Sequence, residues 1–235
     1  MELKRDHWTQ TDYGDFTEYL KSLADEKYKT FSDSLVPGAE ASWGVRIPVL
    51  RQTAKEISKG NYTEFLECKK GVYREEIMID GLVMSLIKCD YPHMLGYIKM
   101  YADKITSWET CDIVSFKGVK KFLPQLWNDI EYFIYNDNNW IVRYGFGMLL
   151  EFYLTDEYID GVLNYVNSVN SDFYYVQMMQ GWLIATAAAK CRDKTFAFLE
   201  NNALNAVTQN MAVRKIRESN RISKEDKEKA KQFKK

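Results

Sequence analysis

The sequence predicts an all-α protein, an α-solenoid in which antiparallel helix pairs stack along the chain. Only four prolines occur in the 235 residues, and none interrupts a long periodic segment. No run rich in Val and Ile alternates with the period of two that is typical of strands. Apolar helical segments recur every 31 to 35 residues, and two-helix units that repeat at such an interval are typical of solenoids.

The first of these helices is expected to begin at Pro48, since proline suits a first helical turn and the apolar residues after it form one stripe. Five further apolar helices are expected at 74–88, 107–116, 138–154, 173–190 and 210–219. Their midpoints lie near Gly81, Asp112, Phe146, Gly181 and Lys215. More polar helices are expected between them, at 157–167 and 193–202. An irregular helical bundle also fits this pattern, but the even spacing favours stacked pairs.

Glycines lie inside several of these helices, where each costs about 1 kcal/mol relative to alanine. For Gly81 we expect tight packing between helices to offset that cost. Gly145 and Gly181 adjoin Arg143 and Trp182, and there we interpret glycine as the floor of a groove.

The composition narrows the class of protein. With 46% apolar and 28% charged residues, the chain has ample material for a globular core. It contains no apolar stretch long enough to span a membrane and no apolar signal core at its N-terminus, so we expect a cytoplasmic protein that does not enter membranes. Four cysteines without CxxC pairing and only two histidines indicate reduced thiols, not a disulfide framework or a metal site.

Positive charge is concentrated in the last part of the chain. Residues 214–235 contain ten Lys or Arg and four Asp or Glu, a net charge of +6. Since the whole chain carries −1, residues 1–213 carry −7. A basic footprint is typical of nucleic-acid binding, but a solvated terminal helix with internal ion pairs explains this one at least as well.

Four side chains on the expected helices suggest a binding site: Trp108, Asp112, Arg143 and Trp182. A stacked array could bring these indoles, the carboxylate and the guanidinium to one concave wall, which would suit a cationic, flat or sugar-like ligand with a phosphate nearby. The competing interpretation is structural, because tryptophans on helices are more often core residues. We expect a core role for Trp8, Trp43, Trp127 and Trp140. Asp112 and Arg143 could likewise be only a structural pair.

Several segments together resemble one known family. They are "WGVRIPVLRQTAKEISKG", the "WETCD" pair, "NNWIVRYGFGMLL", "YYVQMMQGWLIATAAAK" and the closing "KIRES". In their order and spacing they resemble the DNA alkylation repair family, HEAT-like repeat proteins that include the AlkD-like alkylpurine DNA glycosylases. The resemblance covers roughly residues 12–230. It implies a single HEAT-like repeat domain over residues 1–235, an ARM-type superhelix with a concave groove.

The resemblance also implies roles for the four side chains. Trp108 and Trp182 match two groove tryptophans that hold the deoxyribose of a damaged nucleotide. Asp112 matches the catalytic carboxylate, and Arg143 matches the arginine that contacts the DNA backbone beside the lesion. Active relatives hydrolyse the N-glycosidic bond of cationic N3- and N7-alkylated purines without base flipping, unlike most enzymes that act on bases.

These residue types suit that chemistry. A cationic purine is already a good leaving group, so the reaction needs no strong general acid. A carboxylate can stabilise the oxocarbenium character of the sugar and orient the attacking water, and indole faces also favour a cation. Water is the only other reactant, so neither a metal nor an organic cofactor is expected. The expected partner is alkylated duplex DNA, bound by a monomer.

One segment departs from the family pattern. Active relatives carry a basic, aromatic-rich helix and turn before the "GVRIPVLR" stretch. Here that place is taken by "FSDSLVPGAEASWGVRIP", which has no Lys or Arg between Lys29 and Arg46. We interpret it as a loop with no phosphate-binding surface, and the charge of −7 over residues 1–213 points the same way.

Other basic residues could take over the contacts to DNA. These candidates follow the helices that carry the four site residues: Lys117, Lys120, Lys121, Lys190, Arg214, Lys215 and Arg217, with Arg192 beside Lys190. Scattered solvated charges explain them equally well. Two function classes therefore stay open: a DNA glycosylase, and a catalytically silent homologue that binds nucleic acid or another partner in the same groove.

Overall fold

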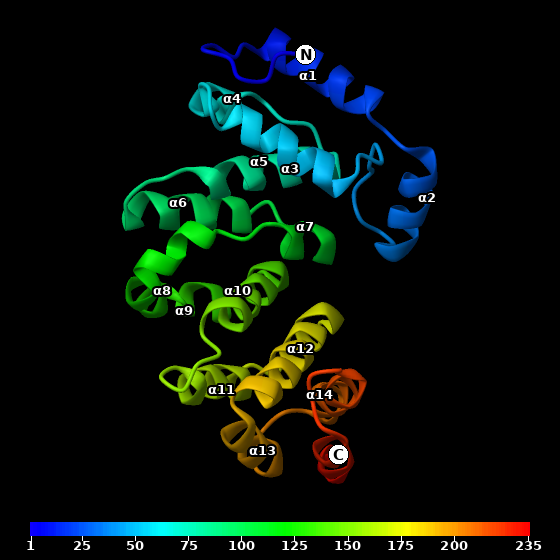
Figure 1. The fold of residues 1–235 in the computed structure, drawn as a ribbon, viewed down its shortest axis with the longest axis vertical. Coiled ribbons are helices and arrows are strands. Elements are labelled where there is room, and N and C mark those ends of the chain that lie inside the picture. The colour runs from blue at the N-terminus through cyan, green and yellow to red at the C-terminus, as the bar shows by residue number, and fades with distance from the viewer. The chain divides into compact units, whose positions relative to one another are not determined.

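The computed structural model describes all residues from Met1 to Lys235 and contains only helices and connecting segments (Figure 1). The fold is all-α, as the sequence predicts, and successive helices pack on their neighbours as in an α-solenoid. The chain divides into two compact units, unit 1 from Met1 to Leu126 and unit 2 from Trp127 to Lys235. The expectation of a single domain over residues 1–235 stays a prediction. None of the helices combines the length and apolar character that crossing a bilayer requires.

Unit 1 contains the helices from the N-terminus to the start of α8. They are α1 (Gln10–Ser22), α2 (Glu26–Leu35), α3 (Ile47–Ile57), α4 (Tyr62–Glu67), α5 (Arg74–Leu86), α6 (Tyr91–Ala102), α7 (Trp108–Ile113), the 3-10 helix η1 (Lys117–Phe122) and α8 (Leu123–Asp129), whose last residues belong to unit 2. Helix α5 is central, because it packs on α3, α6, α7 and η1.

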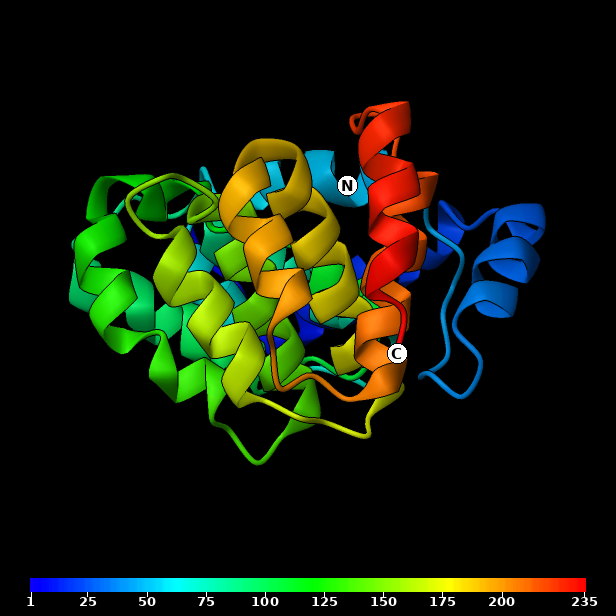
Figure 2. The same cartoon turned by 90° about the horizontal axis from the view of Figure 1, so that it is seen from below.

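Unit 2 contains α9 (Glu131–Ile134), α10 (Asn139–Phe152), α11 (Ile159–Ser168), α12 (Tyr174–Lys190), α13 (Arg192–Glu200), α14 (Ala206–Glu218), α15 (Lys224–Ala230) and the 3-10 helix η2 (Lys231–Phe233). Helix α12 packs on both α10 and α14, so the three expected apolar helices of this unit stack in chain order. Helices α14 and α15 lie side by side (Figure 2). The predicted apolar helices are confirmed, although α7 is only six residues long.

The aromatic core residues behave largely as predicted. Trp8 and Trp43 are buried, and Trp8 packs edge-on against Phe65. Trp127 and Trp140 are half-buried but also packed: Trp127 contacts three tyrosines, and Trp140 lies against Phe173 and Tyr175 of unit 2. All four cysteines are free thiols.

Gly81, Gly145 and Gly181 all serve close helix packing. A Cβ on Gly81 would lie 2.2 Å from Cε2 of Tyr101, so the expectation for this glycine is confirmed. Gly145 faces Phe133 of α9, and Gly181 faces Met211 of α14. The interpretation of the last two as a groove floor was therefore wrong, because each lies against a neighbouring helix, with no open space above it.

The segment 28–46 is partly helical. Helix α2 extends to Leu35 because the side chain of Asp25 accepts a hydrogen bond from the Tyr28 amide and Lys29 pairs with Asp33 one turn later. The expectation of a loop, which began at Phe31, was therefore wrong for residues 31–35. It is right for the residues that follow, where Gly38 adopts a positive φ of 80° and no helix forms before α3.

A buried carboxylate fixes the end of this segment. Glu75, only 2% exposed, accepts hydrogen bonds from the backbone amides of Trp43, Gly44 and Val45 at 3.0, 2.8 and 3.1 Å. Gly44 has a φ of 87°, and a Cβ there would lie 2.9 Å from the carbonyl oxygen of Asp25. Three successive amides aimed at one carboxylate form an anion-binding concavity, which is filled here by the protein's own side chain.

We predict that Gly81→Ala lowers the free energy of unfolding by about 1–3 kcal/mol, the usual cost of overpacking a core. The added methyl group would push against Tyr101, which is fully buried and whose hydroxyl donates to the Thr110 carbonyl. Gly96→Ala in α6 is the matched control, because no atom lies within 4 Å of its Cβ position. That substitution should stabilise the protein by about 0.5–1 kcal/mol. Urea unfolding measures both, and a Gly81→Ala variant as stable as the parent would contradict the packing argument.

Candidate functional site

A pocket of about 360 Å³ in unit 1 brings Trp108 and Asp112 together. It is lined by Tyr28, Phe31, Ser32 and Leu35 of α2, Ile47 and Arg51 of α3, and Trp108, Glu109, Asp112 and Ile113 of α7. Its volume falls in the range of about 300–1,000 Å³ that is common for small-molecule sites. The pocket is therefore large enough to hold one nucleotide-sized group.

Local hydrogen bonds at the start of α7 place these two side chains. Ser107 caps the helix, its hydroxyl accepting from the Thr110 amide at 3.2 Å while the Thr110 hydroxyl accepts from the Ser107 amide at 3.1 Å. Trp108 is thus the first helical residue, and Asp112 lies one turn later on the same face. Asp112 is exposed, and Trp108 is half-buried.

The indole of Trp108 is fixed by the neighbouring helix. Its Nε1 donates to the carbonyl oxygen of Leu35, the last residue of α2, at 3.1 Å. A carbonyl at a helix C-terminus has no partner within its own helix, so this bond satisfies both groups. Helix α2 therefore forms a wall of the pocket and also orients its tryptophan.

Behind the pocket, one buried arginine joins three helices. The Arg74 guanidinium is only 1% exposed; its Nη2 donates to Asp33 of α2, and its Nη1 donates to Glu109 of α7 at 2.6 Å. The Ser42 hydroxyl also donates to Asp33, at 2.7 Å, and the Ser32 hydroxyl donates to Glu109 at 3.2 Å. The network ties α2 and α7 to α5.

The two carboxyl groups of this network are shifted in opposite directions. Burial raises the pKa of Glu109 and outweighs the opposing attraction of Arg74 and the hydrogen bond from Ser32. Burial also acts to raise the pKa of Asp33, but hydrogen bonds from Lys29 and Ser42 and the charge of Arg74 together lower it. Asp33 thus holds its negative charge more firmly than Glu109 does.

A second cation stands at the edge of the pocket. Arg51 is exposed, and its Nη2 donates to the carbonyl oxygen of Ile113, the last residue of α7, at 2.9 Å. It forms no ion pair with any carboxylate of the protein. The remaining N–H groups of the guanidinium are therefore available to an anion.

In unit 2, Trp182 is 45% exposed and lines a second pocket of about 370 Å³. Lys215 and Arg221 line the same pocket, so a cation that the sequence proposed for DNA binding lies beside this tryptophan. Arg143 is positioned differently. It is 5% exposed, donates from Nη1 to the Tyr175 carbonyl at 2.7 Å, and does not line the Trp182 pocket.

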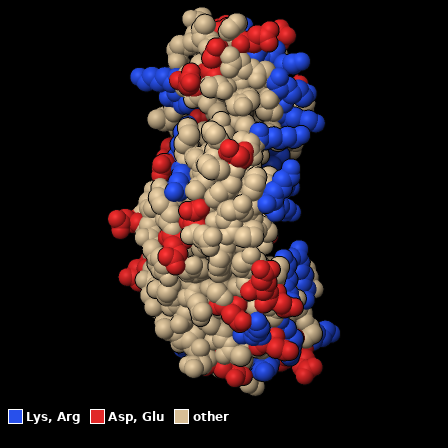
Figure 3. Space-filling view, turned by 90° about the vertical axis from the view of Figure 1, so that its left-hand side faces the viewer, with Lys and Arg blue, Asp and Glu red and all other residues tan.

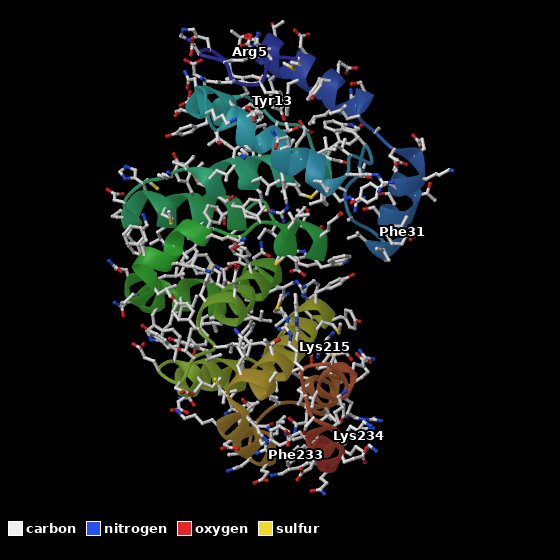
Figure 4. The ribbon with its side chains drawn as sticks, in the orientation of Figure 1. Arg5, Tyr13, Phe31, Lys215, Phe233 and Lys234 are labelled. Atoms are coloured by element: carbon white, nitrogen blue, oxygen red, sulfur yellow. The ribbon has the colours of Figure 1, made fainter.

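The other predicted DNA-binding residues are mostly at the surface. Lys117, Lys120 and Lys121 are exposed on η1 of unit 1, and Lys190 is exposed at the end of α12. Arg214 and Arg217 are exposed on α14 and line a third pocket together with Lys234, which is labelled near the C-terminal end of the chain in Figure 4. Arg192 instead pairs with Asp226 at 2.5 Å. Their assignment to DNA binding stays a prediction.

Ion pairs hold part of the basic C-terminal segment within unit 2. Asp226 of α15 pairs with Arg192, and Lys229 approaches Glu200 of α13 to 3.9 Å. Acidic and basic side chains are accordingly intermixed over the lower end of unit 2 in Figure 3. Within the segment itself, Arg214 and Glu218 of α14 form an i,i+4 pair at 3.9 Å and Lys231 pairs with Glu228, as the structural explanation expects, whereas Arg217 forms no ion pair.

Sequence reasoning missed the α2 wall, Arg51 and the Arg74 network. Phe31 and Leu35 are four residues apart, which is a helical spacing. The nearby Pro37 and Gly38 are typical of a turn, and they favoured the interpretation of the segment as a loop. Nothing in the sequence marks Arg74 as buried. The structure contains no group of three or more His, Cys, Asp or Glu side chains arranged to hold a metal ion.

These features define an all-α protein of stacked helices with a tryptophan-bearing pocket in each unit. Comparison with known families identifies it further: residues 16–216 match the family of DNA alkylation repair enzymes, and the chain belongs to that family. The resemblance found in the sequence is thereby confirmed. No curated protein matches the chain.

We predict that Arg74→Met destabilises unit 1 by about 3–5 kcal/mol at neutral pH, because it leaves two carboxylates without their buried cation. Loss of Arg74 raises the pKa of Glu109 further, so the native state binds a proton more tightly than the unfolded state does. Stability then falls as pH rises through this native pKa, and the deficit should shrink as pH is lowered from 8 to 5.

Urea unfolding at several pH values tests this expectation. Arg46→Met is the matched control, because it breaks an exposed pair with Asp25 whose side chains are 57% and 36% accessible. Such surface pairs contribute about 0–1 kcal/mol. Equal losses of stability for the two variants would show that Arg74 is not the structural centre of this region.

Proposed function

We propose that the protein is an N-alkylpurine DNA glycosylase that hydrolyses the N-glycosidic bond of cationic N3- and N7-alkylated purines without base flipping. The observation that carries the proposal is the exposed Asp112 carboxylate beside the Trp108 indole in one nucleotide-sized pocket. Membership of the DNA alkylation repair enzyme family supports alkylated DNA as the substrate.

In this proposal the C1′–N bond breaks and its electron pair neutralises the positive charge of the departing purine. The sugar gains oxocarbenium character, which the Asp112 carboxylate and the indole face of Trp108 stabilise. Water attacks C1′ from the side of Asp112, which orients it, and its proton passes to solvent. For Trp182, which lines its own pocket in unit 2, the family resemblance implies a contact to deoxyribose.

The cations have proposed roles in holding the DNA. Lys215 beside Trp182, and Arg214 with Arg217 on α14, supply positive charge for phosphates in unit 2. The exposed lysines of η1 supply it in unit 1. Because Arg143 is buried, we assign it to positioning the N-terminal end of α12 through the Tyr175 carbonyl, besides the phosphate contact that the family resemblance implies.

A catalytically silent homologue that binds nucleic acid in the same pocket is the second candidate. The composition of the α2 wall favours it: Phe31 and Leu35 stand where active relatives have a basic segment. Duplex binding without cationic contacts loses its main favourable contribution. The two candidates differ in whether a base is released.

We predict release of N7-methylguanine and N3-methyladenine from methylated duplex DNA at low salt. Asp112→Asn should reduce the rate on the order of 10²-fold or more, because it removes the negative charge from the developing cation. Asp103→Asn is a matched control, since Asp103 is exposed on α6's C-cap and does not line the pocket. Chromatography of the released bases measures the rate, with circular dichroism to verify folding.

Base release that Asp112→Asn retains would refute the catalytic role of this carboxylate. No release by the folded parent protein would refute the glycosylase and favour the silent homologue.

A further inference from the structure

Two apolar side chains stand exposed at the mouth of the unit 1 pocket. Phe31 is 60% exposed and Leu35 is 47% exposed, one turn apart on the same face of α2. Figure 4 shows Phe31 on this helix, at the edge of unit 1. The side of α2 that faces the protein is occupied by Ser32 and Asp33, which join the Arg74 network. The fold of unit 1 therefore leaves Phe31 in water.

The aromatic rings of this pocket are not stacked on other rings of the protein. Neither Phe31 nor Trp108 makes a ring–ring contact, although aromatic residues pair widely elsewhere in unit 1. The hydrogen bond to Leu35 holds the half-buried Trp108 indole by its edge, at Nε1, and neither another ring nor a cation stacks on it. Two ring faces in one pocket form a surface on which a flat molecule can stack.

The pocket also carries one available cation at its edge. Arg51 makes a single hydrogen bond, to the Ile113 carbonyl, and no ion pair. A guanidinium held in this way can still donate to two oxygens of a phosphate. Aromatic faces beside one phosphate-binding group are the pattern of a site for a nucleotide of a single strand.

We infer that this pocket binds an unpaired nucleobase of a DNA strand, which stacks against Phe31 and Trp108 while its phosphate lies on Arg51. The inference rests on the proposed function only in taking DNA as the ligand. In a continuous duplex both faces of each base are covered by its neighbours, so an already unpaired base is the group that fits. Its binding requires no base flipping by the protein.

This site gives the α2 wall a specificity role. Stacking replaces the cationic contacts that residues 30–45 lack, so the protein selects DNA that contains a bulged, gapped or single-stranded nucleotide. A single arginine on a phosphate releases few of the counterions that are bound to DNA. The affinity contributed by this site should therefore depend only weakly on salt concentration.

The experiment measures binding of the full chain to three fluorescein-labelled, undamaged DNAs of equal length by fluorescence anisotropy. They are a continuous duplex, the same duplex with a one-nucleotide bulge, and a single strand. We expect binding to the bulged duplex to be roughly tenfold tighter than to the continuous duplex, the order of effect of stacking one base. Phe31→Ala should abolish this difference, Phe31→Leu should remove most of it, and Phe31→Tyr should retain it.

The matched control is Val72→Ala, because Val72 is 71% exposed and lines a separate pocket of unit 1. It should leave the preference for the bulge unchanged. Equal binding of the three DNAs, or a bulge preference that survives Phe31→Ala, would overturn the inference. So would a Phe31→Ala variant whose main effect is to change the oligomeric state, since the exposed face would then contact a second copy.

Failure of this inference can be told from failure of the proposed function. Base release without a bulge preference would refute only the stacking site. A Phe31-dependent bulge preference without base release would refute only the glycosylase.

Discussion

The structure of unit 1 depends on keeping one guanidinium charged where almost no water reaches it. A buried cation is tolerated only when carboxylates and hydrogen bonds replace its hydration. Arg74 meets this requirement with Asp33 from α2 and Glu109 from α7, and each carboxylate takes a further bond from a serine. Because α2 and α7 supply these carboxylates, moving either helix away from α5 would leave the buried Arg74 charge only partly compensated. The position of the α2 wall is thus an electrostatic requirement more than a result of apolar packing.

The pocket chemistry follows from that arrangement. Glu109 immediately follows Trp108 in the chain, so anchoring Glu109 on Arg74 also orients the first turn of α7. The carbonyl of Leu35 then fixes the indole, and Asp112 projects from the next turn. The polar groups that hold the site face inward, while the groups that would contact a ligand are two rings, one carboxylate and Arg51. A site of this composition favours flat and positively charged groups over extended anionic surfaces.

Much of the fold was predictable because apolar periodicity reports burial directly. The long helices α5, α10, α12 and α14 lie where the sequence places them, since each has enough apolar residues to define a face. Helix α2 was missed because its stability comes from the Asp25 cap and the pairing of Lys29 with Asp33, which a scan for apolar stripes does not detect. For the site, the sequence predicted individual residues but, beyond one pair, not which of them lie together in one pocket. That Trp108 and Asp112 share a pocket follows from their spacing of four, whereas Arg51 and Phe31 reach it through tertiary contacts that no local pattern encodes.

The carboxylate of Glu75 and the backbone turn at Gly44 have an evolutionary consequence. The three amides of Trp43, Gly44 and Val45 point inward only because residue 44 adopts a left-handed conformation, and they are satisfied only because residue 75 is an acid. Neither position can be substituted alone. A side chain at position 44 would turn the amides away and leave the buried Glu75 carboxylate without hydrogen bonds. A neutral residue at position 75 would leave the three amides without an acceptor. In relatives that keep this turn, positions 44 and 75 should therefore covary: a glycine at the first should occur together with an acid at the second.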